Sequence, residues 1–151
     1  SKNSKLRIIN EHAFDGSSIN SISYPSNLKE IKMSAFLNCS DLKTVEIPEN
    51  SELEIIEENA FNGTLIESIY IPPQITQICE WSFRGCIKLK HVEISQNSNL
   101  QIIGKNALRS SKIEKFFIPS QTSQICKGCF RNCLIMIPVQ FIGIMTNKQL
   151  I

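Results

Sequence analysis

The sequence predicts a solenoid, in which the chain winds into about six stacked coils around one shared apolar interior. An aromatic residue returns along the whole chain, at Phe14, Phe36, Phe61, Phe83 and Phe130, with Leu108 in the remaining place. The intervals alternate between 22 residues, as from 14 to 36, and 25 residues, as from 36 to 61. A unit of this length is too small to bury its own apolar face, so it must stack on its neighbours.

Each predicted coil begins with an apolar pair and then brings a small residue beside the aromatic one. The units start near Leu6, Leu28, Leu53, Ile75, Leu100 and Thr122. In the second unit the pair is Leu28 and Ile31, followed by Ala35 and Phe36. The small side chain lets neighbouring backbones approach, and the ring fills the interior. A short polar turn is expected after it.

The segment after this turn has the spacing of one inward-facing strand per coil. Its apolar positions fall at Leu42, Val45 and Ile47 in the second unit, and the same spacing returns in the others, ending with Met136, Val139 and Phe141. The last two apolar residues are two apart, which is the period of a strand. The sequence therefore predicts one parallel ladder, usually ended by a proline, as at Pro48.

A polar residue closes most of these segments. It is Asn27, Asn50 or Asn97 in three units and Gln74 or Gln121 in two others. We expect its side chain to satisfy buried backbone groups where the chain leaves the strand, and stacked copies to bond to one another.

The combined pattern resembles the BspA-like, or Treponema pallidum-type, leucine-rich repeats. Residues 35–39, Ala-Phe-Leu-Asn-Cys, followed by residues 41–48, Asp-Leu-Lys-Thr-Val-Glu-Ile-Pro, are a close match. The departures are Leu108 for Phe and Ser95 for the strand proline. The resemblance implies an α/β, right-handed, horseshoe-like leucine-rich-repeat superhelix with a short irregular, 3-10 or helical convex side. The Ile, Asn, Lys and Ser bias and the alternating short and long units look most like the protozoan surface-antigen members of this family.

We expect residues 1–151 to form a single leucine-rich repeat domain that is a fragment of a longer array. The sequence 2–5, Lys-Asn-Ser-Lys, returns in related form 47 residues later at 49–52, so the chain begins within a repeat. Its longest apolar run, 134–142, is interrupted and is shorter than the ~20 residues of a membrane span. No export signal or membrane span is recognised in this sequence.

The charge is small in total but uneven. The formal net charge is +2, which gives no general attraction to nucleic acid. Residues 46–58 hold six Glu and no Lys or Arg, whereas the following half is basic, through Arg84, Lys88, Lys90, Lys105, Arg109, Lys112 and Lys115. Two interpretations stay open: solvated edges of a stack, or a polarity that orients a charged partner.

The six cysteines do not predict a disulfide framework. Cys39, Cys86 and Cys133 are each separated by two coils, or about 10 Å at the spacing of neighbouring strands, whereas a disulfide needs Cα atoms within about 7 Å. We expect free thiols. Cys126 and Cys129 form a C-x-x-C, but they occupy ordinary repeat positions, so a thiol-dependent redox protein is a remote alternative. We expect no enzyme, no cofactor, no metal and no catalytic residue.

The residues between the inward strand positions form the candidate partner-binding face. They are Thr44, Glu46, Ser68, Tyr70, His91, Glu93, Lys115 and Phe117. Exposed aromatic residues favour a binding role. The resemblance implies a surface antigen or adhesin that attaches to host matrix or cell-surface proteins, located at the cell surface or secreted. The alternative is an intracellular protein-binding scaffold of the same fold, which unpaired thiols favour.

Overall fold

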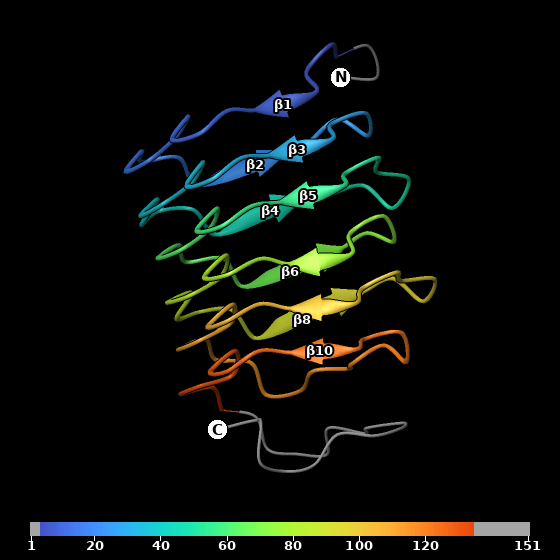
Figure 1. The fold of residues 1–151 in the computed structure, drawn as a ribbon. Helices are drawn as coiled ribbons and strands as arrows, with labels where there is room; N and C mark the ends of the chain where they lie inside the picture. Colours follow the sequence, from blue (N-terminus) through green and yellow to red (C-terminus); the bar gives the residue numbers. More distant parts are fainter. Residues whose placement is uncertain (1–3, 135–151) are drawn as a thin grey trace.

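The chain winds into a stack of similar coils (Figure 1). The computed structural model describes residues 4–134. Within these residues the chain forms ten short strands: β1 Ile8–Ile9, β2 Ser21–Ser23, β3 Glu30–Ile31, β4 Thr44–Glu46, β5 Ile55–Ile56, β6 Ser68–Ile71, β7 Gln77–Ile78, β8 His91–Ile94, β9 Ile102–Ile103 and β10 Gln124–Ile125. Every strand pair is parallel, as expected when equivalent parts of successive coils meet. The predicted repeat solenoid is confirmed.

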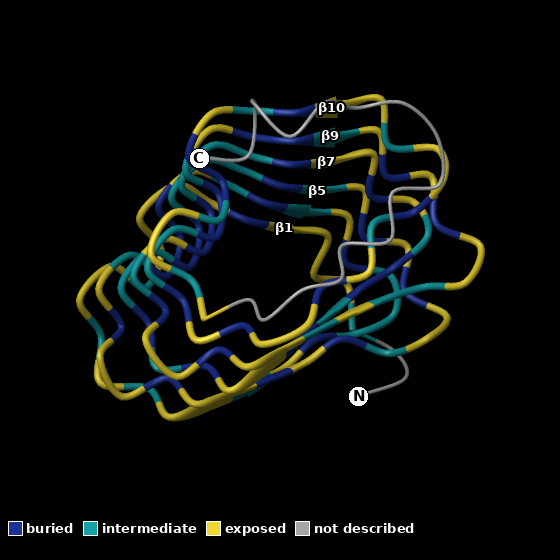
Figure 2. Ribbon diagram, turned by 90° about the horizontal axis from the view of Figure 1, so that it is seen from below, coloured by how far each residue is buried: buried dark blue, intermediate teal, exposed yellow. Residues whose placement is uncertain are grey.

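The first four coils each contribute to two ladders rather than to the single ladder that the sequence predicts. The expected strand segment supplies β2 paired with β4, and β6 paired with β8. The apolar pair at the start of each unit supplies the second ladder, in the orders β1-β3-β5 and β7-β9-β10. Seen along the stack, the two ladders lie on opposite sides of one ring (Figure 2). A strand of two residues is too short to show the alternation of apolar and polar residues, so the sequence did not predict this second ladder.

The second ladder places one isoleucine per coil in the interior. Ile9 pairs in register with Ile31, and Ile31 with Ile56, while Ile78, Ile103 and Ile125 do the same further along. All six are buried, from 0% to 7% exposed. Burying an isoleucine side chain contributes about 1.5–3 kcal/mol each, so this short ladder is a main source of cohesion between coils.

The turn that contains the aromatic residue is also a regular hydrogen-bonded ladder. The amide of Phe14 donates to the Ala35 carbonyl at 2.8 Å, that of Phe36 to Ala60 at 2.8 Å, and that of Leu108 to Cys129 at 2.9 Å. Residues two before and two after the aromatic position have positive φ, as at Asn59 (56°) and Gly63 (76°). Between residues 4 and 134 this side consists of turns without a helix, so the α part of the expected class is absent there.

The aromatic residues form a continuous stack through the first four coils. Successive ring centroids lie 5.0 Å apart for Phe14 and Phe36, 5.2 Å for Phe36 and Phe61, and 5.5 Å for Phe61 and Phe83, with interplanar angles of 2–4°. Leu108 ends the stack. Phe130 instead meets Phe116 edge-on at 5.0 Å. The predicted shared interior is confirmed, with a change of packing in the fifth coil.

The polar residue that closes each strand segment differs from the prediction. Asn50 and Asn97 are exposed, and the buried polar residue is the serine that follows each of them. Ser51 and Ser98 are 2% exposed, and each hydroxyl accepts a 3.1 Å bond from the amide two residues later. Asn27 alone donates across coils, to the Ser4 carbonyl. Met136, Val139 and Phe141 lie outside the described residues.

Candidate functional site

The predicted binding face lies on two successive two-stranded parallel sheets, β2 with β4 and β6 with β8. Hydrogen-bonded register places Thr44 beside Ser21 and Glu46 beside Ser23. Further along, Ser68 pairs with His91, and Tyr70 with Glu93. A parallel ladder in this register repeats the outward positions on every coil. The side chains therefore form two columns across the face, as the sequence predicts; we call this surface the ladder face.

Exposure of the ladder face follows the strand alternation. Val45 and Ile69 point inward and are 9% and 2% exposed. Thr44, Glu46, Ser68, His91 and Glu93 are exposed, and Tyr70 is half-buried. The Ser23 hydroxyl donates to the Glu46 carboxylate, which ties neighbouring coils together on this surface. The face is consequently polar, with one partly sheltered aromatic ring near its middle.

The far end of the face is less regular than the sequence predicts. Lys115 and Phe117 are exposed on either side of the buried Phe116, as the sequence predicts, but residues 113–118 do not form a strand. Phe117 is 67% exposed, the largest exposure among the large hydrophobic residues of the described chain. It borders a hollow of about 240 Å³ lined by Ile94, Ser95, Gln96, Phe117, Ile118, Pro119, Ser120 and Gln121. An exposed ring beside an apolar hollow is suited to protein contact.

All six cysteines are free; Cys39, Cys86 and Cys129 are buried, and the other three are half-buried. In the 47-residue series the thiol donates to a carbonyl of the preceding coil: Cys39 to Phe14 at 2.9 Å, Cys86 to Phe61 at 3.1 Å and Cys133 to Leu108 at 3.1 Å. A hydroxyl lies against the same sulfur each time, from Ser17, Thr64 or Ser111. These thiols close the turn between coils, which gives them a structural role beyond simple volume.

Cys129 of the C-x-x-C pair is poorly suited to thiol chemistry. Cys129 is 1% exposed, and burial raises the pKa of its thiol to about 12. A nucleophilic or redox cysteine requires a lowered pKa and access to solvent. Among the described residues no three His, Cys, Asp or Glu side chains cluster as a metal site would need. In that part of the chain we also find no helix with the length and apolar character of a membrane span.

Two features of the turns around the aromatic position were not predicted from the sequence. The positive-φ columns flank every aromatic position, and the turns they create are hydrogen-bonded from coil to coil. The recurring Gly or Asn two residues after the ring, at Gly16, Asn38, Gly63, Gly85 and Asn132, was a readable signal for them. Glycine and asparagine tolerate this conformation better than other residues.

Comparison with known proteins agrees with this geometry. The family described as BspA type leucine rich repeat region matches residues 7–136 in six copies. No curated protein sequence matches the chain. Among solved structures, the pneumococcal vaccine antigen PcpA is similar with a TM-score of 0.75 and 27% identity over 84% of this chain. A leucine-rich cell surface protein from Faecalibacterium prausnitzii A2-165 has a TM-score of 0.65 and 21% identity over 85% of this chain. The chain spans 34% and 41% of those two structures.

Proposed function

Because this chain belongs to the BspA-type leucine-rich repeat family, we propose that it is a protein-binding module of a surface antigen or adhesin that attaches to host matrix or cell-surface proteins. The observation that carries the proposal is the ladder face, an ordered surface with Tyr70 and Phe117 at its centre and edge. The similarity to PcpA, a pneumococcal vaccine antigen, supports a location at the cell surface or outside the cell.

The ladder face has the composition of a recognition surface. Its residues Thr44, Glu46, Ser68, Tyr70, His91, Glu93, Lys115 and Phe117 combine short polar groups, both signs of charge and two aromatic rings. Aromatic residues contribute much of the binding energy at protein interfaces, and surrounding polar groups exclude water from them. Repeat proteins commonly bind partners along such an extended surface.

The test replaces Tyr70 and Phe117 together by Ala and measures binding to a panel of immobilised extracellular-matrix proteins. We expect at least about a tenfold loss of affinity, since removing one hot-spot residue costs more than about 1.4 kcal/mol. The matched control is Met33→Ala with Ile87→Ala, which removes exposed apolar side chains (37% and 50%) away from the ladder face. Equal affinity of the Tyr70/Phe117 variant and the parent protein would contradict the proposal.

A second function, an intracellular protein-binding scaffold, is favoured by the six free cysteines. Disulfides form in oxidising compartments, and unpaired thiols are more typical of reducing ones. Labelling intact cells with a membrane-impermeant amine reagent separates the two functions. Labelled protein supports the surface antigen, whereas protein that labels only after lysis supports the scaffold.

A further inference from the structure

The turns of the last described coils carry two columns of positive charge, one in the fourth to sixth coils and one in the fifth and sixth. Arg84, Arg109 and Arg131 each follow the aromatic position directly. The turn ladder keeps them in register, because the Gly85 amide donates to the Arg109 carbonyl and the Ser110 amide to the Arg131 carbonyl, both at 2.8 Å. Lys105 and Lys127 form the neighbouring column, three residues before that position. We call these five residues the basic turn face.

The same columns carry acidic or uncharged residues in the earlier coils. Where the later coils have lysine, the first, third and fourth coils have Glu11, Glu58 and Glu80; where the later coils have arginine, the first has Asp15. The change of sign is therefore a property of position along the stack. Neither the repeat pattern nor the core requires it, because these side chains point outward.

The charges of the basic turn face are mostly without partners in the described part of the chain. Lys105 lies 3.4 Å from Glu80. Within residues 4–134, no carboxylate comes within ion-pair distance of the other four cations. Neighbouring coils are about 4.8 Å apart, and like charges at directly opposed positions destabilise a ladder. A folded chain that keeps such a line of cations presents a positive potential suited to an anionic partner.

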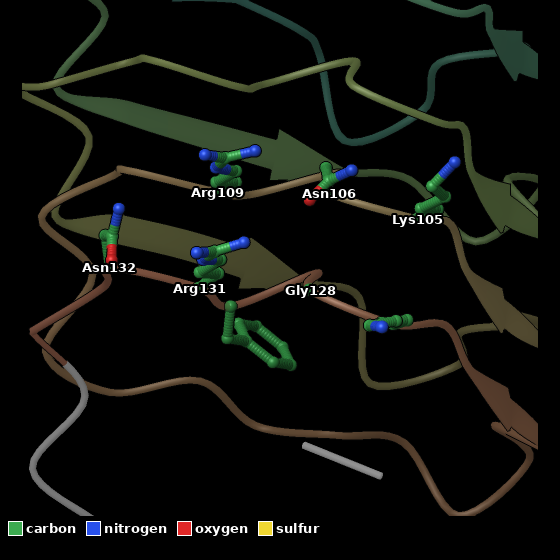
Figure 3. Close-up of a pocket in the computed structure, with 8 residues that line it drawn as sticks. Lys105, Asn106, Arg109, Gly128, Arg131 and Asn132 are labelled. Atoms are coloured by element: carbon green, nitrogen blue, oxygen red, sulfur yellow. The ribbon is translucent and has the colours of Figure 1, made fainter. Parts of the chain in front are cut away.

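Four of these five cations, all except Arg84, line a hollow of about 660 Å³, in which Arg109 and Arg131 lie one above the other on successive coils (Figure 3). Its lining is Lys105, Asn106, Arg109, Lys127, Gly128, Phe130, Arg131 and Asn132. Gly128 has φ +72°, and a Cβ there would lie 2.6 Å from the Asn106 side-chain oxygen. Glycine thus keeps the floor of the hollow open. Two side-chain amides and a single half-buried ring complete the lining.

We propose that the basic turn face binds a linear sulfated polysaccharide of the glycosaminoglycan class, running along the stack. A guanidinium group matches a sulfate as it matches other planar or tetrahedral oxyanions, through paired hydrogen bonds. Asn106 and Asn132 supply amides of the kind that bond sugar hydroxyls. An acidic protein is less suited, because protein interfaces have an apolar centre and Phe130 is the only large apolar side chain in this lining. The site is separate from the ladder face.

The experiment measures binding of a size-fractionated heparin oligosaccharide at a series of salt concentrations. Arg109→Gln with Arg131→Gln is expected to weaken binding at least about tenfold and to lower the slope of log affinity against log salt by about one per cation, as for other linear polyanions. The matched control Lys5→Gln with Lys43→Gln removes the same net charge from exposed positions of the early coils. We expect it to bind like the parent.

Further arms identify the ligand class and guard against loss of folding. De-N-sulfated and de-O-sulfated heparin should bind much more weakly, and polyglutamate and a single-stranded oligonucleotide should not compete at equal charge.

If the glutamine variant unfolds at a lower temperature than the parent, Arg109→Lys with Arg131→Lys provides the second test. This variant should keep the salt slope and bind several-fold more weakly. Polyglutamate or oligonucleotide binding as tight as heparin, or equal loss in the control variant, would overturn the proposal. Tyr70→Ala with Phe117→Ala should leave heparin binding unchanged, which separates this site from the ladder face.

Discussion

The first four coils and the later ones obey the same repeat but are held together differently. In the early coils the rings of Phe14, Phe36, Phe61 and Phe83 stack almost parallel. In the later coils Leu108 breaks the stack, and Phe130 packs edge-on against Phe116. The repeat therefore specifies where an apolar group must be, whereas its neighbours decide how that group packs.

The early and later coils also differ in how their charged side chains are paired. Lys29 pairs with Glu54 at 2.8 Å, and Lys32 with both Glu30 and Glu57. The pairs with Glu54 and Glu57 link neighbouring coils of the early part. The later part has the basic turn face, where Lys105 alone has an ion-pair partner among the described residues. Outward positions are thus free to acquire a local function while the interior keeps the fold.

The largest expected effect is the loss of one ring from the early stack. Phe61 is 0% exposed, and Phe61→Ala should cost about 3–5 kcal/mol by leaving a cavity between Phe36 and Phe83. Phe130→Ala should cost less, because Phe130 is half-buried and lies outside the stack. Urea unfolding followed by circular dichroism measures both. Equal costs would mean that the two packing modes are energetically equivalent.

The next effect tests whether Phe116 replaces the ring that Leu108 lacks. Leu108 is fully buried, and Phe116 is larger than Val45, Ile69 or Val92 at the same strand position. Leu108→Phe alone should cost about 1–3 kcal/mol through overpacking. Adding Phe116→Ile should recover most of that cost, as coupled neighbours do in a double-mutant cycle. Strictly additive costs would show that the two positions do not compensate each other.

The buried thiols predict a loss of stability in alkaline solution. Burial raises the pKa of Cys86 and of Cys129 to about 12 in the folded protein, whereas an unfolded thiol titrates near about pH 8.5. Between these values the unfolded chain loses protons that the folded chain retains, so the free energy of unfolding falls as pH rises. Urea unfolding at successive pH values measures the slope, which should be shallower in Cys86→Ala with Cys129→Ala.

The accessibility of equivalent thiols also differs between the early and later coils. Cys86 is 0% exposed, whereas the equivalent Cys133 of the later part is half-buried. Iodoacetamide followed by peptide mass spectrometry should therefore label Cys133 well before Cys86 in the folded protein. Unfolded protein should label both at once, which is the control. Faster labelling of Cys86 would contradict the described interior.

The smallest effect concerns the ion pairs of the early coils. Lys29 and Glu54 are both substantially exposed, at 45% and 56% for their side chains. Exposed pairs contribute little and are screened by salt. Lys29→Gln should therefore lower the melting midpoint only slightly at low salt and leave it unchanged at high salt. A large shift that persists in high salt would indicate a role for Lys29 beyond this pair.

Most of the fold could be predicted from the sequence, because the same residue pattern recurs in six units. The aromatic interval gave the coils, and the positions of Val45 and Ile69 gave the orientation of the ladder face and both of its columns. The second ladder and the turn ladder were missed. Two-residue strands such as β3 carry no alternation of their own, and backbone bonds between turns involve no particular side chain.

The candidate sites divide in the same way. The outward residues of the ladder face follow from strand periodicity alone, so Thr44 to Glu93 could be named without a structure. The sequence also indicated a basic later half, but it could not gather Lys105, Arg109, Lys127 and Arg131 around one hollow. This grouping depends on the residues with left-handed backbone conformation on both sides of each ring and on the backbone hydrogen bonds between successive turns.

The sequence by itself determined the period, the inward residues and the family, because an apolar pattern repeated through every coil has only one common axis on which to align. Tertiary structure alone decided that the rings stack in one part and meet edge-on in the other, and that cations far apart in the chain share one surface. These depend on distances between coils and on the volume each neighbour leaves free, which no single repeat contains.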